Sequence, residues 1–309
     1  DTMVHLTEEN DFIVLEGDEY LSSPIDRRPK FHLYQPNIAL ISGIAWDHIN
    51  VFPTYENYVE QFEIFIGKIT NGGILVYNEE DAEVKRVSKE ATNPIRKLPY
   101  HTPKYTVSNG VTLLETPEGD MPIEVFGAHN LNNLAGAKWI CQNMGVDEAE
   151  FYEAIASFKG ASKRLEKIAE SKTKVAYKDF AHSPSKVAAT TKAVKEQYPN
   201  RTLIACLELH TYSSLNAEFL KEYEGALEYA DKAVVFYSPD AVKIKQLDEV
   251  SYDQIAAAFN RKDLIIYTNP IEFKDFLFKQ DFDNSALLLM SSGNYGGLNF
   301  DEVKGLISN

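Results

Sequence analysis

The chain has 309 residues, 44% of them hydrophobic and 12% aromatic, which is enough for two domains with full cores and excludes an intrinsically disordered protein. Its 31 basic and 46 acidic residues give a net charge of −15, which excludes non-specific nucleic-acid binding and requires any anionic ligand to meet a local basic cluster. No apolar run approaches a membrane span, the first twenty residues lack a signal-peptide pattern, and Cys141 and Cys206 lie in apolar segments, so we expect a cytoplasmic protein with no membrane partner.

Apolar periodicity in the first half predicts an α/β unit with a small antiparallel addition. The expected elements, in chain order, are strands at 11–16, 37–42 and 73–77, helices at 55–69 and 79–90, an antiparallel stretch over 104–126 with a hairpin at 108–110, and helices at about 131–144 and 147–158.

Acidic residues follow the first two of these strands. Glu16, Asp18 and Glu19 come after the first, and Asp47 and His48 lie a few residues beyond the second. Ligands bind beyond the carboxyl ends of parallel strands, so the two clusters could converge on a divalent cation such as Mg²⁺, which needs few protein ligands. The alternative is a solvated acidic loop, with Asp47 and His48 capping the next helix.

The stretch GAHNLNNLAGAKWI, residues 127–140, places one imidazole and three amides at a predicted helix start. Asn130 and Asn133 are three residues apart and therefore share one face of the first turn. A side-chain amide offers the donor and acceptor pair that the edge of adenine requires. The alternative is a helix cap made by Asn132 or Asn133.

Residues 158–174 form the most basic stretch of the chain, with six basic residues and two acidic ones. Most of these lysines are typical of a solvated linker between domains. Arg164 differs, because a guanidinium between domains can bind a phosphate through two hydrogen bonds.

The second half alternates strands and helices at a spacing typical of a doubly wound parallel sheet. The expected strands are 175–180, 202–208, 233–237, 264–267 and 286–290, and the expected helices are 185–197, 216–229, 252–259, 271–278 and 301–307. Polar residues follow several strands, as a shared crevice would require, namely Asp179 and His182, then Glu208, His210, Thr211 and Ser213, and finally the glycine-rich run at 291–297.

The ordered series EGDEY, WDH, GAHNLNN, FKGASKRLE, KDFAHSPS and SSGNYGGL resembles the Mur ligase family along nearly all of the chain. The family pattern has a Glu-containing acidic loop, a D-H pair after a strand, an H-N-x-x-N helix start, an F-x-G-x-x-x-R-L/R-E junction and a D-Y/F-A-H-x-P turn. Each motif is loose, but all five occur here in the family's order. The details are most similar to the members that act on UDP-N-acetylmuramate.

The resemblance implies ATP and Mg²⁺ as cofactors. Glu16 resembles the family's metal-ligand glutamate, with Glu19 as its neighbour, and His48 resembles the metal-ligand histidine. His182 is similar to the D-F-A-H histidine at the nucleotide and closing interface. Glu16, His48 and His182 are therefore the expected catalytic residues.

The resemblance also implies a nucleotide site. Asn130 and Asn133 resemble the adenine-binding pair, Arg164 resembles the junction arginine near the nucleotide, and Asp179 resembles the aspartate that holds the ribose or hinge region of ATP.

An amine-substrate site is implied by position more than by a matched motif. His210, Ser292 and Asn294 fall where such enzymes bind the incoming amine. Their pattern leaves both L-alanine and the murein tripeptide open as that amine.

Two departures from the family pattern stand out. The chain has no G-x-x-G-K-[ST] phosphate loop, since Gly67 and Lys68 lie late in a helical stripe without the upstream glycine, and it has no UDP-sugar-binding N-terminal domain. We therefore expect residues 1–160 to be the rear part of a central ATPase-type α/β domain and residues 161–309 to be a complete, Rossmann-like C-terminal domain.

The resemblance implies an ATP-dependent ligase that joins an amino-acid or peptide amine to the carboxylate of UDP-N-acetylmuramate through an acyl phosphate, in peptidoglycan synthesis or recycling. Because the phosphate loop is absent, we expect the chain alone to lack ligase turnover. Two alternatives stay open, a non-catalytic nucleotide-binding or interaction module of the same fold, and a metal hydrolase built on Glu16, Asp47 and His48.

Overall fold

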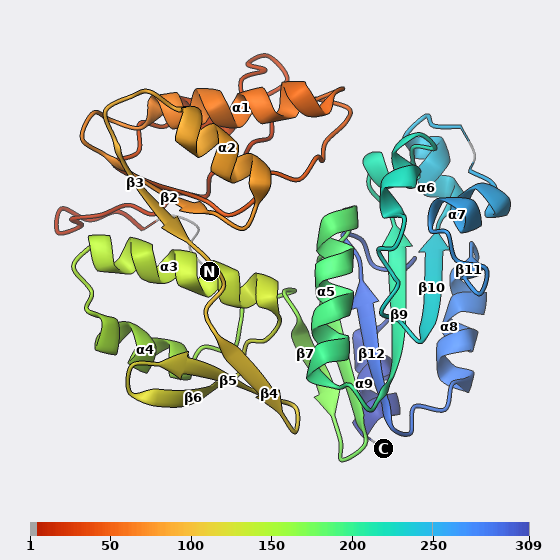
Figure 1. Cartoon of the computed structure of the whole chain (residues 1–309). Coiled ribbons are helices and arrows are strands. Elements are labelled where there is room, and N and C mark those ends of the chain that lie inside the picture. The colour runs from red at the N-terminus through yellow and green to blue at the C-terminus, as the bar shows by residue number, and fades with distance from the viewer. Residues whose placement is uncertain (1–4, 249, 309) are drawn as a thin grey trace.

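Three sheets organise the fold in the computed structural model, which describes residues 5–248 and 250–308 (Figure 1). The first is a three-stranded parallel sheet in the order β1 (Ile38–Ile41), β2 (Ile74–Asn78), β3 (Arg96–Tyr100). Helices α1 (Tyr55–Lys68) and α2 (Ala82–Glu90) cover one face, and α3 (Ala128–Asn143) covers the other. Both faces of the sheet are therefore buried, as the uninterrupted apolar run of β2 predicts.

A small antiparallel sheet follows, formed by β4 (Tyr105–Ser108), β5 (Val111–Thr116) and β6 (Gly119–Ile123). Asn109 and Gly110 make the turn between β4 and β5, both at positive φ, which confirms the predicted hairpin. Helix α4 (Glu148–Ala156) packs with α3 over this sheet through Leu114, Leu131 and Phe151.

The second half is a six-stranded sheet in the order β11-β10-β9-β12-β8-β7. All pairs are parallel except β7 with β8. Its strands are β7 (Glu166–Glu170), β8 (Lys174–Asp179), β9 (Thr202–Leu209), β10 (Lys232–Tyr237), β11 (Ile265–Tyr267) and β12 (Ser285–Met290). Because β12, the last strand in the chain, lies between β8 and β9, the carboxyl ends of these three strands meet.

Helices cover both faces of this sheet, so the predicted α/β class and doubly wound second half are confirmed. They are α5 (Pro184–Gln197), α6 (Pro239–Ile244), α7 (Tyr252–Ala258), α8 (Pro270–Lys279) and α9 (Phe300–Ser308), with short 3₁₀ turns η1 (Lys30–Leu33), η2 (Ser213–Leu215) and η3 (Phe219–Tyr223). No helix in the described ranges is both long and apolar enough to cross a bilayer. The domain boundary at residues 160 and 161 stays a prediction.

Three predicted elements need correction. Residues 11–16 form no strand, and Phe12, Ile13, Val14 and Leu15 are all at least half exposed, because no neighbouring strand pairs with them. The predicted helix at 216–229 is only η3 and turns, since the chain reverses at Gly225 with φ +73°.

Helix α3 is the third correction, because it begins at Ala128, three residues before the predicted start. Gly127 precedes it at φ +87°, and a Cβ there would come within 2.4 Å of the Ala193 Cβ in α5. Only glycine fits this contact, which brings the N-terminus of α3 against the second half of the molecule.

Candidate functional site

Two loops from opposite halves of the chain meet beside the start of α3. Asp47 lies in the loop after β1, and His182 lies in the loop after β8. The His182 Nε2 is 3.7 Å from the Asp47 Oδ2, and both side chains are about nine-tenths buried. The sequence places these residues in two separate motifs, and the fold makes them neighbours.

The Asp47 carboxylate is committed on both oxygens. Its Oδ1 accepts a hydrogen bond of 2.7 Å from the His48 backbone N–H, while its Oδ2 faces His182. The first contact holds His48 at a positive φ of 54°, a conformation uncommon outside glycine. Asp47 therefore holds the backbone at His48 and lies against the His182 ring.

The His182 ring is fixed by backbone contacts. Its Nδ1 lies 2.8 Å from the Phe180 carbonyl oxygen, so Nδ1 carries the hydrogen and Nε2 is directed toward Asp47. The Tyr223 hydroxyl donates to the backbone carbonyl of His182. Burial lowers the pKa of His182 below its ordinary value of 6.5, and the Phe180 carbonyl and the Asp47 carboxylate offset this only in part. The ring is therefore mostly neutral at pH 7.

Glu19 and His48 form a second pair close by. The His48 Nε2 is 3.6 Å from the Glu19 Oε1, and the Tyr58 hydroxyl donates to the same oxygen at 3.1 Å. Tyr20 packs edge-on against the His48 ring at 4.9 Å between centroids. Both members of the pair are a quarter to a third exposed, so water and a ligand can reach them.

Glu16, the third predicted metal ligand, lies apart from this pair. It is exposed in an irregular segment, and no contact among the described residues joins it to His48. The described ranges hold no group of three His, Cys, Asp or Glu side chains arranged to share a metal ion. Glu19 and His48 alone suit a cation such as Mg²⁺, which keeps water and phosphate oxygens as its other ligands.

The start of α3 carries the predicted adenine pair. The Asn130 Nδ2 donates to the Phe126 carbonyl at 3.0 Å, and Asn133 is exposed one turn further on. Neither asparagine caps the helix, because the N-cap is Gly127 and makes no side-chain bond. The alternative interpretation of this stretch as an asparagine cap is therefore wrong.

Asn132, between the two, has a structural role. Its buried Nδ2 lies 3.1 to 3.2 Å from the side-chain oxygens of Asn78, Glu80 and Thr102. Asn78 ends β2, and Glu80 and Thr102 follow β2 and β3, so this network fixes the rotation of α3 on the first sheet. It thereby determines where Asn130 and Asn133 point.

Asp179 ties the junction between the two halves to β8. Its Oδ2 accepts from the Leu165 backbone N–H and its Oδ1 from the Ala181 backbone N–H, each at 2.6 Å. These bonds hold the segment that carries Arg164, whose guanidinium lies over the Phe180 ring, 5.6 Å from its centroid. The predicted hinge aspartate is thus a buried anchor for the junction.

His129 is a residue that the sequence analysis did not single out. Burial lowers its pKa, with the Asp179 charge opposing this shift and the Arg164 charge adding to it. Both charges come from the other half of the chain, so the start of α3 lies near the junction and the end of β8. In the sequence, His129 stands out only as the first residue of the H-N-x-x-N motif.

A further cluster occupies the carboxyl ends of β9 and β12. The Glu208 carboxylate is buried and accepts from the Ser291 hydroxyl and, at 2.8 Å, from the Tyr295 backbone N–H. The His210 Nδ1 is 3.8 Å from the other Glu208 oxygen. A Cβ at Gly293 would lie 2.8 Å from Glu208, so the close approach of this loop requires glycine.

The predicted substrate residues Ser292 and Asn294 belong to the same loop. The Ser292 hydroxyl is buried and has no hydrogen-bond partner among the described residues, whereas the Asn294 Oδ1 accepts from the Gly297 backbone N–H at 3.2 Å. An unsatisfied buried hydroxyl is uncommon and calls for a ligand or a water. Glu208, noted in the sequence only as a strand-end acid, is the residue that organises this cluster.

Comparison with known families gives one match, the Mur ligase middle domain, over residues 1–141. The chain is 28% identical over 237 residues to the UDP-N-acetylmuramate–L-alanine ligase of Caldicellulosiruptor bescii, covering 73% of this chain and 50% of the relative. It is 24% identical over 298 residues to the enzyme of the same name from Lactococcus lactis, covering 92% and 63%. The chain thus spans about half to two thirds of the length of these relatives.

Solved structures share the fold. A murein peptide ligase from Psychrobacter arcticus superimposes with a TM-score of 0.63 at 17% identity, covering 99% of this chain and 66% of the other. A MurF ligase from Thermotoga maritima in complex with ADP gives a TM-score of 0.63 at 17% identity, covering 88% and 62%.

Proposed function

We propose that the chain is part of a Mur ligase, and that the complete protein containing it uses ATP to join an amine to the carboxylate of UDP-N-acetylmuramate, in peptidoglycan synthesis or recycling. The observations that carry the proposal are the meeting of the loop after β1 with the loop after β8, where Asp47 and His182 are 3.7 Å apart, and the packing of the start of α3 on the second half at Gly127 and Ala193. Three family motifs far apart in sequence supply these elements.

The nucleotide site of the proposal lies at the start of α3. Asn130 and Asn133 present amides to the adenine edge, and the free N–H groups of the helix N-terminus favour an anion. Arg164 faces the phosphates from the junction that Asp179 anchors, and a guanidinium suits phosphate oxygens. The site thus draws its residues from both halves of the chain.

The proposed metal ligands are Glu19 and His48, with Glu16 joining them only if its segment moves. A bound Mg²⁺ would neutralise charge on the transferring phosphoryl group. Tyr58 holds the Glu19 carboxylate and Asp47 holds the His48 backbone, so the chain itself orients both donors.

The reaction proposed has two steps. A carboxylate oxygen of UDP-N-acetylmuramate attacks the γ-phosphorus, the bond to ADP breaks, and an acyl phosphate forms. The amine nitrogen then attacks the acyl carbon, inorganic phosphate leaves, and the nitrogen loses a proton. The close packing of His182 against Asp47, both largely buried, helps to exclude water from the acyl phosphate.

The amine site of the proposal is the cluster at the ends of β9 and β12. The Glu208 carboxylate and the His210 imidazole attract an ammonium group, and Ser292 and Asn294 line the same loop. We favour the murein tripeptide as the amine. Offering the complete protein each amine with UDP-N-acetylmuramate and ATP tests this, and turnover with L-alanine alone would overturn the assignment.

The adenine assignment is tested by binding of a magnesium complex of a non-hydrolysable ATP analogue to the complete protein. Asn130→Ala and Asn133→Ala should each weaken binding by about tenfold, the range for loss of a bidentate contact to adenine. Asn143→Ala, at the far end of the same helix, is the matched control and should leave binding unchanged. Equal affinity in all three variants would contradict the proposed site.

The rival functions make different predictions. A non-catalytic module would bind the analogue without turnover, and a start codon at this point of the coding sequence, with no in-frame phosphate loop upstream, would favour it. A hydrolase built on Glu16, Asp47 and His48 would need a water-activating metal and no nucleotide. The separation of Glu16 from His48, and the hydrogen bond that already occupies the Asp47 Oδ1, argue against that hydrolase.

The chain itself offers a simple check. Its 309 residues contain no phosphate loop, so the purified chain should form no amide even with every substrate supplied. Amide formation by the purified chain would contradict the proposal that another segment holds the phosphates.

A further inference from the structure

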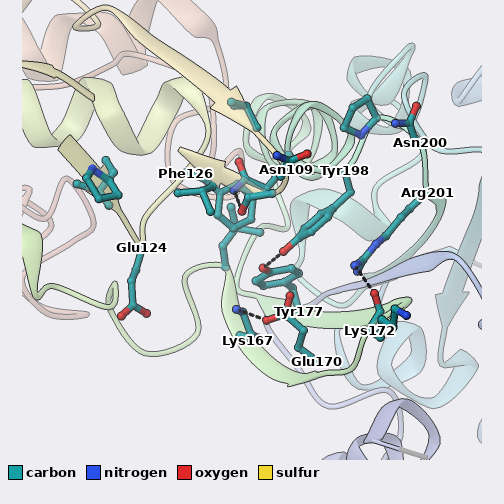
Figure 2. A pocket seen from close by; sticks show the side chains of 18 of the residues that line it. Asn109, Glu124, Phe126, Lys167, Glu170, Lys172, Tyr177, Tyr198, Asn200 and Arg201 are labelled. Atoms are coloured by element: carbon teal, nitrogen blue, oxygen red, sulfur yellow. Dashed lines mark hydrogen bonds and ion pairs between the residues drawn. The ribbon is translucent and has the colours of Figure 1, made fainter. Parts of the chain in front are cut away.

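A cavity of about 710 Å³ lies where the antiparallel sheet faces the second half of the molecule (Figure 2). Its walls come from the β4–β5 turn, the end of β6, the β7–β8 hairpin and the segment that follows α5. Arg201 precedes β9, Asn284 precedes β12 and Lys172 precedes β8, so the cavity lies at the amino ends of these strands. It is therefore at the opposite end of the sheet from the Asp179 and His182 site.

The walls of this cavity are bonded to each other. Gln197 at the end of α5 donates to the Gly110 carbonyl at 2.6 Å and accepts from the Thr112 hydroxyl at 3.0 Å. The Tyr177 and Tyr198 hydroxyls are 2.7 Å apart, and Figure 2 shows this pair at the centre of the cavity wall. The cavity is thus held open by contacts within the chain and needs no ligand to form.

Its charge is opposite to that of the chain. Four basic side chains, Lys159, Lys167, Lys172 and Arg201, line it against two acidic ones, Glu124 and Glu170, a balance of +2 in a chain of −15. Lys167 is already paired with Glu170 at 2.6 Å. The positive charge left for a ligand is on Lys159, Lys172 and Arg201, and an acidic protein that concentrates it in a cavity favours an anion there.

Arg201 supplies the most specific feature. Its guanidinium stacks on the Tyr198 ring at 4.7 Å, and its Nη2 makes a long contact of 3.4 Å to the Lys172 carbonyl. Its Nη1 is buried and has no hydrogen-bond partner among the described residues. Among the described residues no carboxylate forms an ion pair with Arg201, and the side chain as a whole is partly exposed, so its charge is left to pair with an anionic oxygen.

The remaining wall is apolar. Phe126, Leu165, Tyr177 and Tyr198 are all buried residues that border the cavity. Each of these side chains exposes less than a tenth of its surface, so together they offer an organic anion a narrow apolar contact that an inorganic ion could not make.

We propose that this cavity binds a small organic phosphate ester, whose phosphate group pairs with Arg201 and Lys172 and whose apolar part lies against Phe126, Leu165 and the tyrosine pair. A phosphate suits a site with one stacked guanidinium and one mobile ammonium, because its oxygens accept from both. The proposal does not depend on the ligase assignment, since the two charged partners of the phosphate, Arg201 and Lys172, are not residues of that site.

Calorimetric titration of the 309-residue chain with phenyl phosphate, inorganic phosphate and phenol tests the proposal. Phenyl phosphate should bind, and inorganic phosphate and phenol should each bind at least about tenfold more weakly, because each lacks one half of the contact. Equal binding of inorganic phosphate would overturn the organic part of the proposal, and no binding of phenyl phosphate would overturn all of it.

Variants locate the binding. Arg201→Ala should weaken phenyl phosphate by about tenfold or more, the loss expected for a charged hydrogen bond, and Arg27→Ala, an exposed arginine outside the cavity, is the matched control. Because Arg201 also packs on Tyr198, Lys172→Glu serves as a second variant on an exposed side chain that leaves the packing intact. Unchanged affinity in folded Lys172→Glu would contradict the site.

Discussion

The two ends of the chain fold under different constraints. In the six-stranded sheet, β9, β10 and β12 are buried on both faces and paired on both sides, and nearly every residue of them is inaccessible. Residues 5–37 contain one apolar run, yet the region forms only a 3₁₀ turn and one isolated β-bridge and leaves Phe12 to Leu15 exposed. A run of apolar residues thus becomes a strand only where another strand is present to bond with it.

The largest effect should come from paired truncations in these two regions. Leu288→Ala in β12 removes a fully buried side chain and should lower the free energy of unfolding by about 2–5 kcal/mol, through lost burial and the cavity left behind. Leu15→Ala, the same change in the exposed run, should cost less than about 0.5 kcal/mol. Urea unfolding measures both, and a comparable loss in Leu15→Ala would mean that this run is buried in solution.

A second comparison concerns acidic side chains. Glu208→Ala leaves the Ser291 hydroxyl and the Tyr295 backbone N–H without their acceptor, and should cost about 2 kcal/mol. Asp18→Ala in the N-terminal region breaks its pair with Lys30, whose side chain is two-fifths exposed, and should cost less than about 1 kcal/mol. Urea denaturation of the two variants measures the two losses in the free energy of unfolding. If Asp18→Ala proved the more costly, the N-terminal region would be more tightly built than its contacts indicate.

These contrasts explain which parts of the fold were predictable. Five strands of the six-stranded sheet follow from their apolar runs, whereas β7 lies in the basic stretch that was interpreted as a linker. Strand β3 was not predicted either; it contains Pro99, which an edge strand tolerates. The helix predicted at 216–229 ends early, because η3 stops at Tyr223 and Gly225 takes a positive φ that an α-helix does not allow. Each miss depends on a backbone conformation or a neighbour that periodicity does not reveal.

The sequence motifs of the candidate site could be predicted, but the contacts between the site residues could not. Motif order identified Asp47 and His182, but their contact depends on how the first sheet packs against the second half. Glu208 was marked only by its position after a strand, since the Ser291 and Tyr295 bonds that make it central come from a loop far along the chain.

The pH dependence of stability should divide between the same regions. Burial lowers the pKa of His32, His129 and His182 below the ordinary value of 6.5, so the unfolded chain binds protons more readily than the folded one as the pH falls. The stability these residues contribute is complete above about pH 6.5 and is lost below it. The free energy of unfolding should therefore be smaller at pH 5.5 than at pH 7.5.

Single variants show which histidine causes the loss of stability at low pH. His182→Gln should flatten it, because the residue with the Asp47 contact no longer titrates, whereas His5→Gln, on an exposed residue, should leave it unchanged. A slope that His182→Gln does not alter would assign the effect to the other two histidines.

The smallest effect on stability is expected at the pair that we propose for the metal. Glu19→Gln removes the charge beside His48 and keeps the Tyr58 hydrogen bond, and because the pair is partly exposed the free energy of unfolding should change by less than about 0.5 kcal/mol. The magnesium dependence of ATP-analogue binding to the complete protein should nevertheless weaken clearly, since a carboxylate is the stronger of the two donors for Mg²⁺. Glu16→Gln provides the comparison within the same loop. If Glu16→Gln weakens the magnesium dependence as much as Glu19→Gln does, then the exposed segment that carries Glu16 joins the site when the ligand binds. Ligand binding would then order a segment that is exposed in the free chain.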